Sequence, residues 1–326
     1  RWWDQAFEAA GYENAFQVEL LPEGADPMDV RYNIIQWVHR STRGWSYGGS
    51  VRDPRTNEIM KGKVTLGSLR VRQDYLIAEG LLAPYDDEEK PNAMMEMSLA
   101  RIRQLSAHEV GHTLGIQHNM AASTQGRSSV MDYPHPLIRI GDDGRIDISQ
   151  AYAEGIGEWD KRVIIWGYED FPEGTDRRAA REQIMADTID AGFVYVSDPD
   201  SRPVSSAHPL GNLWDNGADS VEELNNLLAV RALALAAFSE NNIRPGQPMA
   251  TIEEVLVPIY LLHRFQLIAA GKHVGGHTWT YTLRGDGQDL ATPVPGDTQR
   301  EAIAALLKTL TPDVLRLPDN VLTLIP

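Results

Sequence analysis

The sequence predicts an α+β fold, with a region of mixed strands and helices followed by a region that is mainly helical. Short segments rich in β-branched and aromatic residues alternate with Gly-rich bends between residues 14 and 68. From about residue 92 to residue 114, apolar residues recur with helical spacing, and no Pro or Gly interrupts them until Gly111. Helical patterns dominate after residue 170, so we expect one domain over residues 1–170 and a second over residues 171–326.

The elements expected in the first domain follow from periodicity and from turn residues. In the opening segment, Trp3 and Phe7 share one side of a helix that Gly11 would end. Alternating apolar residues then predict strands, and a Gly follows the long central helix at Gly115. The predicted elements are a helix over 1–11, strands over 14–20 and 30–38, a strand–turn–strand over 50–68, and helices over 92–114 and 155–167.

The second domain carries repeated signals for helix starts. A Ser or Thr followed three residues later by Glu is typical of a capping box, in which each side chain bonds the other residue's backbone. Three such pairs occur, at Ser220 and Glu223, Thr251 and Glu254, and Thr298 and Glu301. Each pair predicts a helix beginning at its first residue.

Composition excludes several classes of protein. The formal net charge of −16 argues against a nucleic-acid partner, because such binding relies on clustered Lys and Arg. The absence of cysteine excludes disulfides, thiolate nucleophiles and Cys-ligated zinc. No apolar run approaches the roughly 20 residues that cross a bilayer, so we expect no transmembrane segment.

The segment AHEVGHTLGIQHNM carries the strongest chemical signal in the chain. His108 and His112 are four residues apart, so a helix presents both imidazoles on one face. Gly115 can adopt a left-handed conformation that ends the helix, and the chain can then return His118 as a third ligand. A catalytic Zn²⁺ typically has three protein ligands, such as neutral imidazoles, and a fourth coordination position open to water or substrate. Glu109, beside the first ligand, can reach a metal-bound water.

Chance is a poor explanation of this motif. Two histidines four apart on a helix usually mark only a solvated surface. Five specified residues at average frequencies match with a probability of order 10⁻⁷ per starting position, which stays below ~10⁻³ over the chain. A degenerate, inactive site is the alternative that this estimate leaves open.

HEVGHTLGIQH resembles the HExxHxxGxxH signature of the metzincin zinc metalloproteases. The segment SSVMDYP is similar to the methionine turn of that clan, which implies that Met131 forms an apolar floor beneath the metal. GIGEWDK and IIWGY extend the resemblance to a bacterial family of zinc-dependent metalloproteases, with weaker similarities at NLWDNG and HVGG. A metzincin-like catalytic domain, with a twisted sheet and an active-site helix, is therefore expected before the helical region.

The resemblance also implies a mechanism. His108, His112 and His118 would bind one Zn²⁺, and Glu109 would act as general base and then general acid in peptide hydrolysis. Ser129 to Tyr133 is similar to the Met-turn of the astacin and serralysin branches, in which the tyrosine stabilises the transition state. The alternative is that Tyr133 only packs beside the turn.

Substrate binding is expected to follow from the same resemblance. Metzincins hold an extended peptide against an exposed edge strand above the active-site helix. The candidate edge is the segment from Lys61 to Ser68, and its expected substrate-binding residues are Lys63, Val64, Thr65, Leu66 and Gly67. A metzincin sheet also begins with a strand before its first long helix, whereas this chain opens on a helical segment. We expect that strand either in a segment preceding Arg1 or in a different arrangement of the sheet.

Other candidate sites receive simpler interpretations. GDDGRID lacks the acid pattern of an EF-hand, so we favour a polar turn over a calcium site. The two glycines between His273 and His277 argue against a second metal site, and His135 is expected in a loop.

The sequence therefore predicts a zinc endopeptidase acting on peptide or protein substrates in an extracytoplasmic location, periplasmic or secreted. The alternatives are a catalytically inactive zinc-containing binding or scaffold module and a zinc hydrolase of non-peptide amides.

Overall fold

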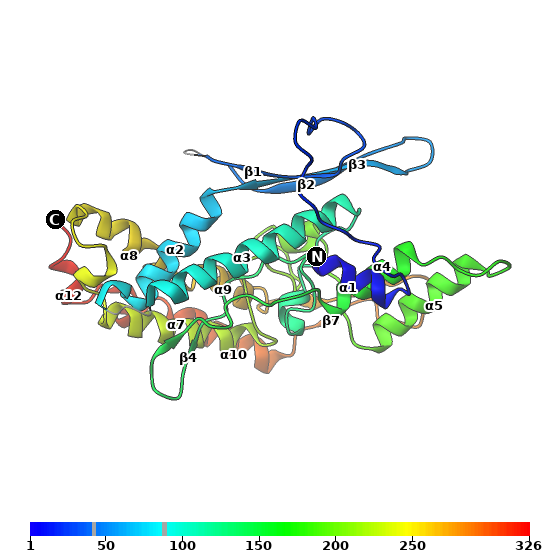
Figure 1. Ribbon diagram of the computed structural model, residues 1–326. Coiled ribbons are helices and arrows are strands. Elements are labelled where there is room, and N and C mark those ends of the chain that lie inside the picture. The colour runs from blue at the N-terminus through cyan, green and yellow to red at the C-terminus, as the bar shows by residue number, and fades with distance from the viewer. Residues whose placement is uncertain (41–43, 87–89) are drawn as a thin grey trace. The chain divides into compact units, whose positions relative to one another are not determined.

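The computed structural model describes residues 1–40, 44–86 and 90–326 (Figure 1). These residues form two compact units. Each unit is assembled from separate segments of the chain. The first comprises Arg1–Leu69, Arg103–Asp132 and Glu154–Ser197, and the second comprises Arg70–Ile102, Tyr133–Ala153 and Asp198–Pro326. The predicted cut between residues 170 and 171 does not coincide with these units, and it stays a prediction about independently folding domains. The combination of many helices with a small mixed sheet confirms the α+β class.

A three-stranded sheet belongs to the first unit, in the order β1 (Ile34–Val38), β3 (Ile59–Gly67) and β2 (Tyr47–Arg52). β1 runs parallel to β3, and β2 runs antiparallel to it. These strands confirm the predictions for residues 30–38 and 50–68. The strand predicted over residues 14–20 is wrong, because the chain there forms no strand and leaves Leu20 96% exposed. Alternating residues suit a half-buried surface only where a neighbouring strand completes the hydrogen bonds.

The predicted edge strand is also corrected by the sheet. Lys63 is paired with Ile34 on one side and with Gly49 on the other, so β3 is the middle strand of the three. Val64 and Leu66 are buried, as expected of a central strand. The described edges are β1 and β2, and the Gly-rich start of β2 has the composition of a bend.

Helices complete the first unit. α1 confirms the predicted N-terminal helix, and its Trp3 indole donates to the Ala107 carbonyl at 2.8 Å. α3 confirms the long central helix, and its later turns belong to this unit, where the sheet lies over them (Figure 1). α4 confirms the helix predicted over 155–167, although it begins at Glu158. The bounds are α1 Trp2–Ala9, α3 Lys90–Thr113, η2 Ala122–Gln125, α4 Glu158–Tyr168 and α5 Arg177–Asp190.

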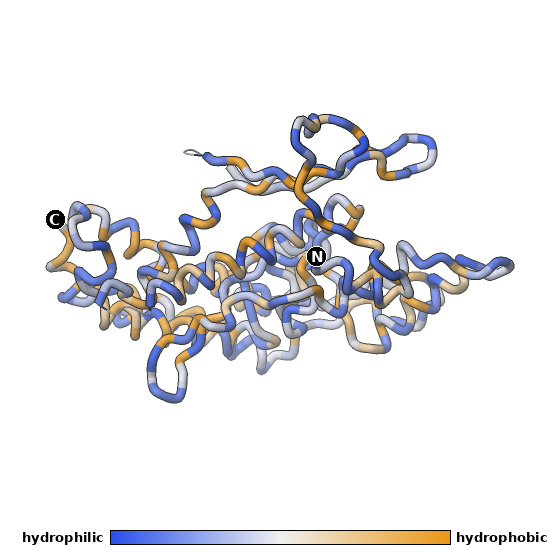
Figure 2. Tube along the Cα trace, in the orientation of Figure 1, coloured by the Kyte–Doolittle hydropathy of each residue, from blue (hydrophilic) through white to orange (hydrophobic). Residues whose placement is uncertain are grey.

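The second unit is mainly helical, and α7 and α8 supply much of its core, which includes Leu227, Ile252 and Ile259. The hairpin of β4 and β5 contains the segment GDDGRID, whose first five residues form the turn, where the chain is hydrophilic (Figure 2). Its helices are α2 Leu69–Leu82, η1 Pro84–Asp86, α6 Asp198–Ser201, α7 Ser220–Ala236, η3 Glu240–Asn242, η4 Met249–Thr251, α8 Ile252–Tyr260, α9 Arg264–Gly271, α10 Gly296–Lys308, α11 Pro312–Leu315 and α12 Asp319–Leu322. Its strands are β4 Arg139–Ile140, β5 Ile146–Asp147, β6 His277–Thr278 and β7 Thr292–Pro293.

Helices occur near each predicted capping box, but the caps differ. α7 is capped by Asp219, whose side chain accepts from the Val221 and Glu222 amides, so Ser220 is not the cap. Thr251 does precede α8, yet its side chain makes no capping bond. Thr298 lies inside α10. The capping-box predictions are therefore wrong in their hydrogen bonds, although the helices exist.

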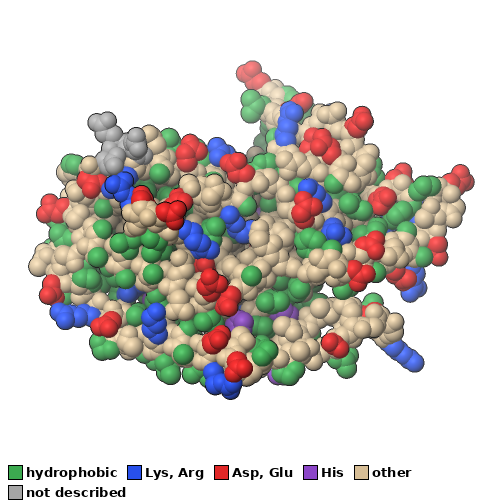
Figure 3. Space-filling model, turned by 90° about the horizontal axis from the view of Figure 1, so that it is seen from below, with side chains coloured by type: hydrophobic (Ala, Val, Ile, Leu, Met, Phe, Trp, Pro, Cys, Tyr) green, Lys and Arg blue, Asp and Glu red, His purple; other side chains and the backbone are tan. Residues whose placement is uncertain are grey.

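Two properties of the described residues bear on partners. No helix there combines the length and the apolar character that a bilayer crossing requires. On the face drawn in Figure 3, acidic and basic side chains are interspersed.

Candidate metal centre

Three imidazoles converge at the end of α3 in the first unit. His108 and His112 project from the helix, and His118 comes from the loop that follows it. The His118 Nε2 lies 3.0 Å from the His112 Nε2 and 3.2 Å from the His108 Nε2. Within the described part of the chain, this is the only group of three potential metal-binding side chains with such convergence.

The tautomers of two rings follow from their other contacts. The His108 Nδ1 donates to the Val130 carbonyl at 2.8 Å, and the His112 Nδ1 donates to the Ile116 carbonyl at 2.9 Å. A carbonyl only accepts, so each Nδ1 carries the proton and each Nε2 presents a lone pair. The Nε2 of His118 lies close to both lone pairs, so a cation bound among the three nitrogens would be stabilised by them.

The donor set fits zinc. In a tetrahedral site with zinc–nitrogen distances of about 2.0–2.1 Å, ligand nitrogens are about 3.3–3.4 Å apart. The two nitrogen–nitrogen separations in the structure are close to that value. Orientation of a ligand histidine by a carbonyl on its other nitrogen is the usual arrangement around such a metal.

Backbone geometry explains how the loop returns His118. Gly115 has φ +92°, which confirms the predicted left-handed end of the helix. The Ile116 amide then bonds the Gly111 carbonyl at 3.0 Å, and the buried Ile116 presents its carbonyl to His112. The turn that ends the helix therefore also orients a ligand.

Met131 lies directly against this helix. Its side chain is fully buried, and its Sδ would be 2.2 Å from a Cβ at Gly111. Gly111 lies between His108 and His112 in the sequence. A side chain at this position would occupy the place of the Met131 side chain, so the observed packing requires glycine. The histidine motif by itself gives Gly111 no role, and the signal in the sequence is a glycine inside a helical pattern.

Asp160 of α4 holds the methionine turn in place. Its carboxylate accepts from the Ser129 hydroxyl at 2.6 Å and from the Val130 amide at 2.8 Å. The Ser129 Oγ in turn accepts from the Met131 amide at 2.9 Å. Since the Val130 carbonyl orients His108, Asp160 supports the metal centre from outside it.

Burial raises the pKa of Asp160 to about 6, although its hydrogen bonds with Ser129, Val130 and Gly157 act in the opposite direction. Sequence reasoning did not single out this residue. The segment GIGEWDK, which carried part of the family resemblance, contains it.

Asn119 anchors the loop that carries His118. The backbone amide of Asn119 donates to the Met131 carbonyl at 3.2 Å, which joins the loop to the methionine turn. Its side chain donates to the Val194 carbonyl at 2.9 Å and accepts from the Val196 amide at 3.1 Å. The segment after α5 therefore stabilises the third ligand.

Glu109 is buried, with 4% of its surface exposed, in the helix beside His108. The edge strand β2 passes directly over it, because a Cβ at Gly48 would lie 1.9 Å from the Glu109 carbonyl oxygen. The strand, the glutamate and the histidines are all in the first unit.

Tyr133 and His135 belong to the second unit, where residues of the C-terminal region hold them. The Tyr133 carbonyl accepts from the Trp214 amide at 2.8 Å, and its ring lies 5.9 Å from the Trp214 ring. The guanidinium of Arg202 lies over the same ring at 5.2 Å.

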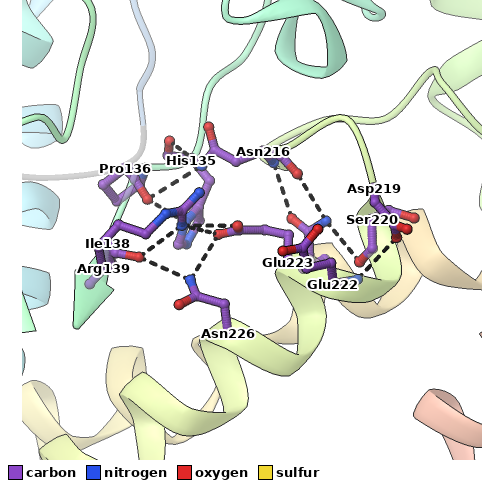
Figure 4. Close-up of polar contacts among 11 residues, drawn as sticks. His135, Pro136, Ile138, Arg139, Asn216, Asp219, Ser220, Glu222, Glu223 and Asn226 are labelled. Carbon is purple, nitrogen blue, oxygen red and sulfur yellow. Dashed lines mark hydrogen bonds and ion pairs between the residues drawn. The ribbon is translucent and has the colours of Figure 1, made fainter. Parts of the chain in front are cut away.

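His135 is buried and its carbonyl accepts from the Asn216 side chain at 2.9 Å (Figure 4). Burial lowers the pKa of His135 to about 4, so its ring is neutral at pH 7. Its place in a loop is as predicted, and these contacts give it a structural role within the second unit. The segment NLWDNG supplies both Trp214 and Asn216.

The other histidines singled out in the sequence lie in separate contacts. The His273 Nε2 and the Ser220 Oγ are 2.8 Å apart, whereas His277 begins β6.

A helix that carries HExxHxxGxxH, ended by a left-handed glycine and backed by a buried methionine turn, defines a metzincin-type centre. The chain belongs to the Met-zincin family, whose model matches residues 90–325. No curated protein and no solved structure matches the chain. The family match begins with α3, so it covers the histidines and the methionine turn but not the sheet. Family and donor set together support a zinc metalloprotease fold.

Proposed function

We propose that the protein is a zinc-dependent endopeptidase. The observation that carries the proposal is the convergence of three histidine Nε2 atoms, two of them with lone pairs directed by carbonyls on the opposite nitrogen. A zinc ion held there would supply a Lewis acid and a bound water with a pKa of about 7.

Glu109 is the proposed general base and acid. A carboxylate next to the first ligand can take a proton from the attacking water and deliver it to the leaving amine. Its burial in α3 limits the positions that the carboxylate can adopt.

The substrate is proposed to bind along β2 rather than along β3. β2 is an edge of the described sheet, and an extended peptide can add to such an edge through main-chain hydrogen bonds. The close approach of Gly48 to Glu109 brings this edge over the general base. Such binding favours unfolded chains over folded proteins.

Tyr133 is proposed to stabilise the oxyanion, on the support of its spacing from Met131. If so, Tyr133→Phe should lower kcat about 10- to 100-fold with little effect on KM or zinc affinity. Unchanged kcat would leave the tyrosine as a packing residue of the turn.

The proposed function is tested by comparing zinc-loaded wild type with Glu109→Ala on an unfolded protein substrate. The variant should keep zinc and lose roughly 10²–10⁴-fold in rate. If neither protein cleaves while both hold zinc, the chain is a zinc-containing binding module instead. Cleavage of small amides without cleavage of peptides would identify a non-peptide amidase. An extracytoplasmic location stays a prediction, and fractionation of the source cells checks it.

A further inference from the structure

One face of β2, called its inner face below, lies against the end of α3, the helix that carries His108 and His112. Gly48 lies on Glu109, and four residues later the guanidinium of Arg52 lies on Gly115, with its Nη2 2.9 Å from the position of a Cβ. β2 therefore runs in the same direction as this part of α3. His112 lies between these two contact points along the chain.

Arg52 stands at the end of this edge strand with its side chain oriented. Its Nε donates to the Ser50 Oγ at 3.1 Å, which directs the guanidinium along the inner face. The residue is nevertheless exposed to solvent. A bulge between Val51 and Arg52 marks the point where regular pairing with β3 ends.

No carboxylate among the described residues forms an ion pair with Arg52. The acid nearest in the chain, Asp53, is bound by Arg55 at 2.7 Å. In a protein with a net charge of −16, Arg52 is thus a cation available beside the proposed cleft.

We propose that Arg52 selects substrates with an acidic side chain on the amino-terminal side of the cleaved bond. The inference rests on the proposed function, because it assumes that the peptide pairs with β2. Antiparallel pairing is the more stable mode for such an added strand. In that mode the substrate residue beside Arg52 precedes the residue beside Gly48, so the acid comes before the bond that is cut. A guanidinium recognises a carboxylate through two parallel hydrogen bonds.

A simpler role for Arg52 is to stabilise the C-terminal end of α3, where the helix dipole favours a positive charge. That role predicts a change in stability but no change in the ranking of substrates. The two roles are therefore separated by measuring selectivity.

The test uses extended peptides that differ at one position, occupied by Glu, Gln or Lys and scanned along both sides of the cleaved bond. We expect wild type to prefer Glu over Lys on the amino-terminal side, on the order of tenfold in kcat/KM. Arg52→Glu should invert this preference, and Arg52→Gln should remove it. Arg55→Glu, on the same hairpin, should leave it unchanged. Added salt should weaken the preference because the site is exposed.

A peptide-binding measurement tests the inference independently of catalysis. The same peptides, labelled with fluorescein, are titrated against Glu109→Ala with and without Arg52→Glu. Preferential binding of the Glu peptide that Arg52→Glu inverts supports the inference even if the hydrolysis proposal fails. Equal affinity for the three peptides in the Glu109→Ala protein, or a preference that Arg52→Glu leaves intact, overturns it.

Discussion

At the residue scale, the proposed metal centre depends on atoms outside the three histidine side chains. The Val130 and Ile116 carbonyls fix which nitrogen of His108 and His112 carries the proton. Without these carbonyls, each ring could present an N–H to the centre instead of a lone pair. Asp160 holds the Val130 amide, so a buried carboxylate on another helix stabilises the orientation of a ligand.

Asp160 should make stability depend on pH in mildly acidic solution. The folded protein keeps its proton up to about pH 6, whereas an unfolded chain releases it near about pH 4. The folded state therefore binds more protons in this window, and stability contributed by this group falls as pH rises through it, by up to about 3 kcal/mol. Urea unfolding of zinc-free wild type and Asp160→Asn across the window measures the effect.

The variant lacks the titrating group, so the stability advantage of wild type should shrink as pH rises. If the unfolding free energies of the two proteins change in parallel with pH, Asp160 does not titrate in this range. The remaining difference above pH 6 reports the hydrogen bonds that asparagine cannot replace, about 1–3 kcal/mol.

At the element scale, the relation between β2 and α3 decides where a peptide can lie. The two elements approach so closely at Gly48 and Glu109 that no side chain fits between them. A motif search finds the helix, but the glycine pair at the start of β2 has the composition of a bend. Which strand forms the edge is decided by pairing between distant segments, and local sequence does not specify it.

Gly48→Ala should displace β2 from α3, because the new Cβ would lie 1.9 Å from a backbone oxygen that cannot move aside easily. We expect a loss of about 1–3 kcal/mol in unfolding free energy and a larger fractional loss of peptidase activity. Chemical denaturation and kcat/KM on one peptide substrate measure the two effects.

Gly49→Ala is the matched control, since a Cβ there meets nothing within 4 Å. It should leave both stability and activity close to those of wild type. Equal losses in the two variants would contradict the close approach of β2 to the helix.

At the scale of the whole molecule, the centre joins segments that are distant along the chain. Trp3 of α1 bonds Ala107, Asp160 of α4 holds the methionine turn, and Val196 after α5 binds Asn119. A metal bound by the three histidines therefore stabilises the first unit as a whole.

Removal of zinc should lower the stability of the protein substantially. Zinc at a thousandfold excess over its Kd contributes about 4 kcal/mol, so a chelator should lower Tm in calorimetry. Affinity should weaken in acidic solution, because the imidazoles must be deprotonated to bind.

His118→Ala should abolish most of the zinc-dependent rise in Tm by removing one ligand. His39→Ala, which changes an exposed histidine outside the cluster, is the control. A full zinc response in His118→Ala would exclude the proposed site.

By itself, the sequence determined the long helix, its glycine end, the identity of the three histidines and the methionine turn that follows them. The helix, its end and the three histidines are local features, because helical spacing and a left-handed glycine bring residues within eleven positions together. The methionine turn follows from the family resemblance. Tertiary structure alone decided the roles of Gly111, Asp160 and β2. Each depends on close approach between segments distant in the sequence, and spacing along the chain carries no information about such contacts.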